Sequence, residues 1–252
     1  MGQHGKHRPL VIRAALIVFA LWAGVAQAAC RQALALGLDV SGSVDAGEYD
    51  LQMQGVARAL ADPDVLRALG TLPEVPVHLA IFEWSGPGYQ RLIVPWQPVT
   101  GALDVAAIAQ VLQSQTRTIV PPTTGLGTAM QYGAGLMAQR PDCWRHTLDI
   151  SGDGKNNAGP HPQDITGQLA AMEVNALVIG VGSNDRLSHE EIEVGELTTY
   201  FQTHVIRGPN AFTQVALGYD DYARALRRKL LRELAIPNLS LLSVGNSRPV
   251  YQ

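Results

Sequence analysis

Short apolar runs alternate with helical patterns along most of this chain, and this alternation limits the available folds more than any other feature. A buried run at 33–40 precedes a helical pattern at 46–61, and similar pairs recur as far as a helical pattern at 210–234. Parallel strands need long crossover connections, which are usually helices that cover both faces of the sheet. The sequence therefore predicts an α/β fold: a doubly wound, mainly parallel six-stranded sheet with helices on both faces.

One pair of strands should break the parallel pattern. Five residues, 86–90, separate the apolar runs 75–85 and 91–99, and so short a connection is typical of a hairpin. This predicts one antiparallel edge strand. The remaining strands are expected at 33–40, 146–151, 175–182 and 203–208. The helices are expected at 46–61, 104–114, 126–139, 162–172, 188–201 and 210–234.

The first 28 residues have the anatomy of a secretory signal peptide. A basic start precedes an apolar core at 14–25, and Ala26-Gln27-Ala28 forms a small-x-small cleavage site. The apolar core is shorter than the ~20 residues that a membrane span needs, although an uncleaved N-terminal anchor is the alternative. We therefore expect a signal peptide at 1–28, one domain at 29–236 and a tail at 237–252. The mature chain should be exported, periplasmic or secreted, and not membrane-spanning.

Charge argues against a nucleic-acid partner. The full chain has a formal charge of −3, and the signal peptide holds basic but no acidic residues, so the mature chain is more acidic still. Binding to nucleic acid needs clustered Lys and Arg. The one basic stretch, 224–233, is better explained as the solvated face of a C-terminal helix.

The two cysteines are predicted to form a disulfide. Cys30 lies nine residues before Asp39, and Cys143 lies ten before Asp153, each just ahead of a predicted strand. If those strands are parallel neighbours, both cysteines reach the same edge of the sheet. Export to an oxidising compartment favours their pairing over two free thiols.

Small polar side chains gather where three predicted elements should meet. Ligand sites in open parallel sheets form at the carboxyl ends of the strands. The oxygen-bearing residues expected at that edge are Asp39, Ser41 and Ser43 after the first strand, Thr123 and Thr124 before a helix, and Asp153 after a later strand. All are hard oxygen donors without His or Cys, a set that suits Mg²⁺, Mn²⁺ or Ca²⁺ and disfavours zinc. Two carboxylates balance a divalent charge and leave room for a carboxylate from outside.

These motifs resemble the metal-ion-dependent adhesion site of the von Willebrand factor A-like family, which includes integrin inserted domains. The resemblance rests on "DVSGSV", "TTGLGTAM" and "DISGDGKNN", and it covers about 33–234, closest to a bacterial secreted branch. It implies a Rossmann-like sheet and a divalent cation, Mg²⁺ first. The implied metal ligands are Asp39, Ser41, Ser43, Thr124 and Asp153. Thr123 is the alternative to Thr124, and Pro121 and Pro122 stand where the family usually carries glycines.

The resemblance implies a binding domain, not an enzyme. The cation would bind an Asp or Glu side chain of a protein partner, and relatives can couple this to movement of the C-terminal helix, here 212–234. The alternative is a metal-dependent phosphohydrolase of the haloacid dehalogenase kind, which also places an aspartate after the first strand. That chemistry needs an acid two residues later, where this chain has Ser41, and a lysine, for which Lys155 is the candidate.

Overall fold

A computed structural model describes Gly2, residues 30–180 and residues 187–236. The predicted signal peptide, apart from Gly2, and the predicted tail at 237–252 lie outside the described residues. In the described part of the chain, no helix is both long enough and apolar enough to cross a membrane.

The sheet has the predicted class. Its six strands lie in the order β3-β2-β1-β4-β5-β6, with the pair β2–β3 antiparallel and the other pairs parallel. The strands are β1 (Gln32–Asp39), β2 (Val77–Trp84), β3 (Gln90–Val99), β4 (His146–Gly152), β5 (Glu173–Ile179) and β6 (Thr213–Ala216). The hairpin strand β3 is an edge strand, as the short connection predicted.

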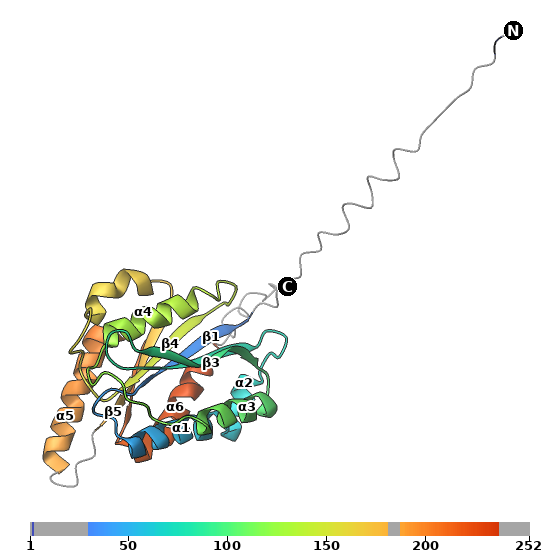
Figure 1. The fold of residues 1–252 in the computed structure, drawn as a ribbon. Coiled ribbons are helices and arrows are strands. Elements are labelled where there is room, and N and C mark those ends of the chain that lie inside the picture. The colour runs from blue at the N-terminus through green and yellow to red at the C-terminus, as the bar shows by residue number, and fades with distance from the viewer. Residues whose placement is uncertain (1, 3–29, 181–186, 237–252) are drawn as a thin grey trace, which may run out of the picture.

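Helices cover both faces of this sheet. In Figure 1, α4 lies on one side of the strands, and α1, α3 and α6 lie on the other. The helical elements are α1 (Ala46–Leu60), α2 (Pro63–Leu69), α3 (Ala102–Gln113), α4 (Leu126–Met137), η2 (Pro162–Leu169), α5 (Leu187–Tyr200), the π-helical turn η3 (Phe201–Val205), the 3₁₀ turn η4 (Tyr219–Asp221) and α6 (Tyr222–Leu234). Asp45 and Glu48 have the sequence spacing of a capping box, and they form one at the start of α1.

The central strand β1 divides the core by its alternation. Leu34, Leu36 and Leu38 belong to the core under α1 and α6, whereas Ala33 and Ala35 belong to the core under α4. Successive side chains of a strand point to opposite faces, and each fully buried Leu contributes roughly 1.5–3 kcal/mol. The strand is buried throughout, including Asp39 at its carboxyl end.

The predicted strand at 203–208 is wrong, and so is the continuous helix at 210–234. Phe201 and Val205 lie one helical turn apart and are both buried, so the chain continues α5 through the π turn η3. Residue Arg207 then makes a single antiparallel bridge to β5. The sixth strand is β6, and Gly218, with φ of +81°, turns the chain before α6 begins at Tyr222. Glycine adopts this conformation without the steric cost that other residues incur.

The short helix α2 was missing from the predicted elements, although its signals are present. Asp62 caps its first turn, Pro63 occupies the first position and Gly70 follows the last. Long-range contacts fix it in place: the guanidinium of Arg31 donates to the carbonyls of Ala68 and Leu69 at its C-terminal end.

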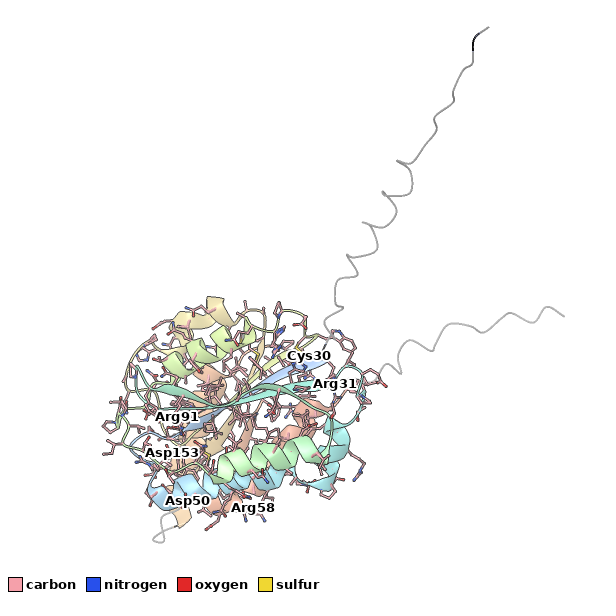
Figure 2. All side chains as sticks on the ribbon, turned by 45° about the vertical axis from the view of Figure 1, so that its right-hand side comes forward. Cys30, Arg31, Asp50, Arg58, Arg91 and Asp153 are labelled. Carbon is pink, nitrogen blue, oxygen red and sulfur yellow. A yellow bond between two sulfur atoms is a disulfide. The ribbon has the colours of Figure 1, made fainter. Side chains whose placement is uncertain are left out.

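The predicted disulfide is present. Cys30 precedes β1 and Cys143 precedes β4, and their Cα atoms lie 4.5 Å apart. Since β1 and β4 are parallel neighbours, the bridge joins the amino ends of the two central strands. Figure 2 shows Cys30 at one end of the fold and Asp153, which follows β4, towards the opposite end.

Candidate metal centre

The first part of the site is the loop that follows β1. Asp39 is the last residue of this strand and is fully buried, and its Oδ1 accepts a hydrogen bond from the backbone N–H of Ser41 at 2.8 Å. Its other carboxylate oxygen, Oδ2, is buried and has no hydrogen-bond partner. Helix α1 is capped separately by Asp45. The carboxylate of Asp39 is therefore not used as a helix cap.

Three separate loops bring their oxygen atoms together at this edge. The hydroxyls of Ser41 and Ser43 lie 3.4 Å apart, and the Thr124 hydroxyl lies 3.4 Å from that of Ser41. The hydroxyl of Ser43 donates to Oδ1 of Asp153 at 2.6 Å. With Asp39 beside Ser41, the structure gathers all five residues that the motifs singled out.

Burial makes the two carboxylates unusually basic. Desolvation and, next, the neighbouring charge of Asp153 raise the pKa of Asp39 from its ordinary value of 3.8 to about 8, although hydrogen bonds from Ser41 act in the opposite direction. Desolvation also raises the pKa of Asp153, while hydrogen bonds from Ser43 and Tyr219 oppose the rise. Two buried carboxylates facing one another are costly when both are ionised, and a cation between them offsets that cost.

The donor set fits a hard divalent cation. The orphaned Oδ2 of Asp39 is a buried acceptor that receives no hydrogen bond from the protein. The oxygen atoms near it belong to hydroxyls and to a second carboxylate. Oxygen atoms of these kinds are ligands of Mg²⁺, Mn²⁺ and Ca²⁺. In the described residues, no group of three or more His, Cys, Asp or Glu side chains has a metal-binding arrangement. The candidate centre therefore depends on hydroxyls as well as carboxylates.

Two glycines on neighbouring loops make room for the prolines before Thr124. The N–H of Gly42 donates to the carbonyl of Pro122 at 3.0 Å, and a Cβ at Gly42 would lie 2.8 Å from that ring. A Cβ at Gly86 would lie 2.1 Å from the hydroxyl of Thr123. The loop thus reaches the site although its own glycines are missing, and Thr124, which is 5% exposed, is the threonine next to Ser41.

Sequence reasoning missed the two asparagines that hold the Thr124 loop. The side chain of Asn157 accepts a hydrogen bond from the backbone N–H of Thr124 at 2.8 Å. The backbone N–H of Asn157 donates to the carbonyl of Thr124 at 2.9 Å. The side chain of Asn156 accepts from the N–H of Gly127 at 3.2 Å. Helix α4 has Gly125 as its N-cap and no side-chain cap of its own, and this was the signal that acceptors from elsewhere were needed for its first N–H groups.

Three further residues contact the site from outside the motifs. Tyr219 donates from its hydroxyl to Oδ2 of Asp153 at 3.3 Å, and Gln52 donates to the carbonyl of Asp39 at 2.9 Å. Arg117 donates to the carbonyl of Ser41 at 3.2 Å. No motif or spacing in the sequence indicated that these three residues contact the site.

The lysine proposed for a phosphohydrolase has another partner. The ammonium of Lys155 lies 3.4 Å from Glu196, and both side chains are more than half exposed. The residue two positions after Asp39 is the buried Ser41, which cannot serve as the acid of that reaction.

Comparison with known proteins places this geometry in context. A family model described as "Protein of unknown function (DUF1194)" matches residues 29–238. No curated protein matches the sequence.

Several solved structures share the fold at low sequence identity. Proximal thread matrix protein 1 from the mussel byssus has a TM-score of 0.55 at 16% identity, over 81% of this chain and 48% of that one. The pilus adhesin SpaC from Lactobacillus rhamnosus GG has a TM-score of 0.58 at 15% identity, over 82% and 30%. A von Willebrand factor type A structure from Catenulispora acidiphila has a TM-score of 0.52 at 12% identity, over 81% and 43%.

This chain spans less than half the length of these three structures. A further structure of the mussel protein, with a TM-score of 0.54 at 16% identity, is described as having a zinc-occupied MIDAS motif. At such identities the similarity shows the fold.

Proposed function

The chain belongs to the DUF1194 family, which is von Willebrand factor A-like, and from this membership and the site geometry we propose a metal-dependent protein-binding domain of the adhesion or scaffold type. The orphaned, fully buried Oδ2 of Asp39, near hydroxyls from two loops and a carboxylate from a third, is the observation that carries the proposal. The domain would be exported and would act by binding, not by catalysis.

The proposed ligands are Asp39, Ser41, Ser43, Thr124 and Asp153. A divalent cation there would supply an electrophilic centre for one more oxygen ligand. Mg²⁺ is the first candidate, and Mn²⁺ and Ca²⁺ are the others, because the donors are hard oxygens without His or Cys. The zinc named for the mussel protein supports a divalent ion at such a site.

The proposed partner is a protein that presents an Asp or Glu side chain. Asp39 and Asp153 together neutralise a divalent ion, so the loaded site would still attract a carboxylate at an open position. The adhesin and matrix proteins of the same fold are consistent with such a role.

Metal binding by the purified mature chain is the primary test. Calorimetry should show one site for Mg²⁺ or Mn²⁺, lost in Asp39→Ala and Asp153→Ala and retained in Asp50→Ala, which changes an exposed aspartate of α1. Circular dichroism would show that each variant is folded. A folded wild-type chain without metal affinity would refute the proposal.

Partner binding needs its own experiment. Capture from the exported fraction should retain a protein in Mg²⁺ or Mn²⁺, lose it in EDTA, and lose it with the Asp39→Ala chain as bait. A metal-dependent phosphatase activity that survives Ser41→Ala and is lost in Asp39→Ala would instead favour the enzyme alternative.

A further inference from the structure

A second cluster of charged side chains lies under α6, away from the candidate metal centre. Lys229 and Glu233 come from consecutive turns of α6, and Asp149 comes from the central strand β4. Their exposed fractions are 0%, 1% and 3%, so the whole cluster is removed from water. Nothing in the proposed binding function uses these groups, and buried charges of this kind are costly.

The two carboxyl groups contact the lysine in different ways. Nζ of Lys229 donates a hydrogen bond to Oε1 of Glu233 at 2.5 Å. Nζ is also 2.6 Å from Oδ2 of Asp149, yet neither oxygen of Asp149 accepts a hydrogen bond. The nitrogen is therefore in close contact with the carboxyl group of Asp149, in poor alignment for a hydrogen bond. The amine and the carboxyl group of Asp149 are thus already in contact, which a bond between them requires.

The surroundings hold this arrangement in place and keep it apolar. Asn175 on β5 donates to Oε1 of Glu233 at 2.8 Å and accepts from the N–H of Phe212 at 3.0 Å. The Phe212 ring centroid lies 5.3 Å from Nζ of Lys229. The small space beside Asp149 is lined by Ser151 and Tyr222 and mostly by leucines: Leu36, Leu38, Leu177 and Leu226. Low-dielectric surroundings favour the protonated form of a buried carboxyl group such as that of Asp149.

We propose that Lys229 and Asp149 join in an intramolecular amide bond, with Glu233 as the proton-transfer group. Glu233 takes a proton from Nζ, and the freed lone pair attacks Cγ of the protonated Asp149 side chain. The bond from Cγ to the hydroxyl oxygen then breaks. Glu233 returns the first proton to the leaving oxygen and takes a second from nitrogen, so one water departs and Glu233 ends protonated. No oxidant, reductant or cofactor is needed.

Burial of Asp149 supports the protonation state that the reaction needs. Desolvation raises the pKa of its carboxyl to about 7, although the charge of Lys229 acts in the opposite direction. A protonated carboxylic acid offers a better leaving group than a carboxylate, which would have to release an oxide. The amide would connect α6 covalently to the central strand and prevent the helix from leaving the sheet.

Peptide mapping of the wild-type chain tests the bond directly. Trypsin should release residues 146–155, which contain Asp149, joined to residues 229–232, which contain Lys229. The joined pair should be lighter than the two free peptides by one water, about 18 Da. Trypsin also cuts after an unmodified Lys229, so free 146–155 together with free 230–232, and no joined product, would overturn the proposal. So would 229–232 joined to the peptide beginning at Glu233, because that bond lies within α6.

Variants separate the chemistry from the packing. Glu233→Gln keeps the size of the side chain but removes the proton acceptor, so the two peptides should be recovered unjoined from a folded protein. Glu196→Gln is the matched control, because it changes the exposed partner of Lys155 and should leave the bond in full yield. Full cross-linking in Glu233→Gln would overturn the role of Glu233.

Discussion

The hydroxyl of Tyr219 donates a hydrogen bond to Oδ2 of Asp153 across 3.3 Å, from the 3₁₀ turn that leads into α6. The other oxygen of the same carboxylate is held by Ser43. Both oxygens of one proposed metal ligand are thus oriented by hydroxyl donors, and one donor lies far from the motifs in sequence.

Loss of this hydroxyl should weaken metal binding. Hydrogen bonds that orient a ligand typically change metal affinity by about 10–100-fold, so we expect Tyr219→Phe to weaken Mn²⁺ binding at least ~10-fold by calorimetry. Tyr222→Phe is the control, since its ring stacks on Tyr219 but its hydroxyl faces Ser151. Equal Mn²⁺ affinities for wild type and Tyr219→Phe would contradict the prediction.

The metal-free chain should lose stability as pH rises. The folded-state pKa of Asp39 is raised from 3.8 to about 8, so between these values the folded chain binds more protons than the unfolded chain. The free energy of unfolding in EDTA should therefore fall with pH across this window. Urea titrations at pH 5 and pH 8 measure the fall. Asp39→Asn, which cannot ionise, should flatten it, and an equal slope in both chains would exclude Asp39 as its source.

Metal uptake should release a proton over the same pH window. At neutral pH a raised pKa leaves Asp39 largely protonated, and the cation must displace that proton. Calorimetry at pH 7 in two buffers of different ionisation enthalpy should give different apparent binding enthalpies. The affinity should increase towards pH 8, and an affinity independent of pH would refute this.

Removal of the disulfide should cost stability without changing the metal centre. The bridge spans 113 residues, and closure of a loop of this length is worth about 4–5 kcal/mol in the chain-entropy account. Cys30→Ala with Cys143→Ala should lower the free energy of unfolding by roughly 2–5 kcal/mol in urea. Mn²⁺ affinity should be retained, because the cysteines lie at the opposite end of the strands. A stability unchanged by the double substitution would contradict the prediction.

Two glycines of α4 should respond to alanine with opposite signs. A Cβ at Gly127 would lie 2.0 Å from the carbonyl oxygen of Pro160, whereas nothing lies within 4 Å of a Cβ at Gly135. We expect Gly127→Ala to destabilise the fold by about 1–3 kcal/mol and Gly135→Ala to stabilise it by about 0.5–1 kcal/mol. Thermal unfolding of the two variants is the measurement, and a gain in stability for Gly127→Ala would count against the close contact.

Local pattern was sufficient for most of the fold. The apolar run that became β1 and the short connection before β3 specified a mainly parallel sheet with one antiparallel edge, because strand burial and hairpin length are properties of neighbouring residues. The pattern failed at 203–208 and 210–234. The sixth strand is the segment that pairs with β5, and this is Thr213–Ala216, not 203–208. The expected helix at 210–234 begins only after this strand and the turn at Gly218.

Part of the candidate site could likewise be predicted from local sequence, and part of it could not. Asp39, Ser41 and Asp153 could be singled out because each follows an apolar strand, and their residue types already indicate a hard cation. The resemblance already favoured Thr124 over Thr123. Only the tertiary structure shows the supports from Asn157 and Tyr219 and the orphaned oxygen of Asp39.

The sequence by itself determined the α/β class, the capped first helix, the pairing of Cys30 with Cys143 and the kind of oxygen donors at one edge of the sheet. Each of these follows from short-range pattern or from residue chemistry. Only the tertiary structure decided that Lys229 lies against Asp149 and that Tyr219 reaches Asp153. Such contacts join residues far apart in the chain, and their positions are set by how α6 and its preceding turn pack on the sheet.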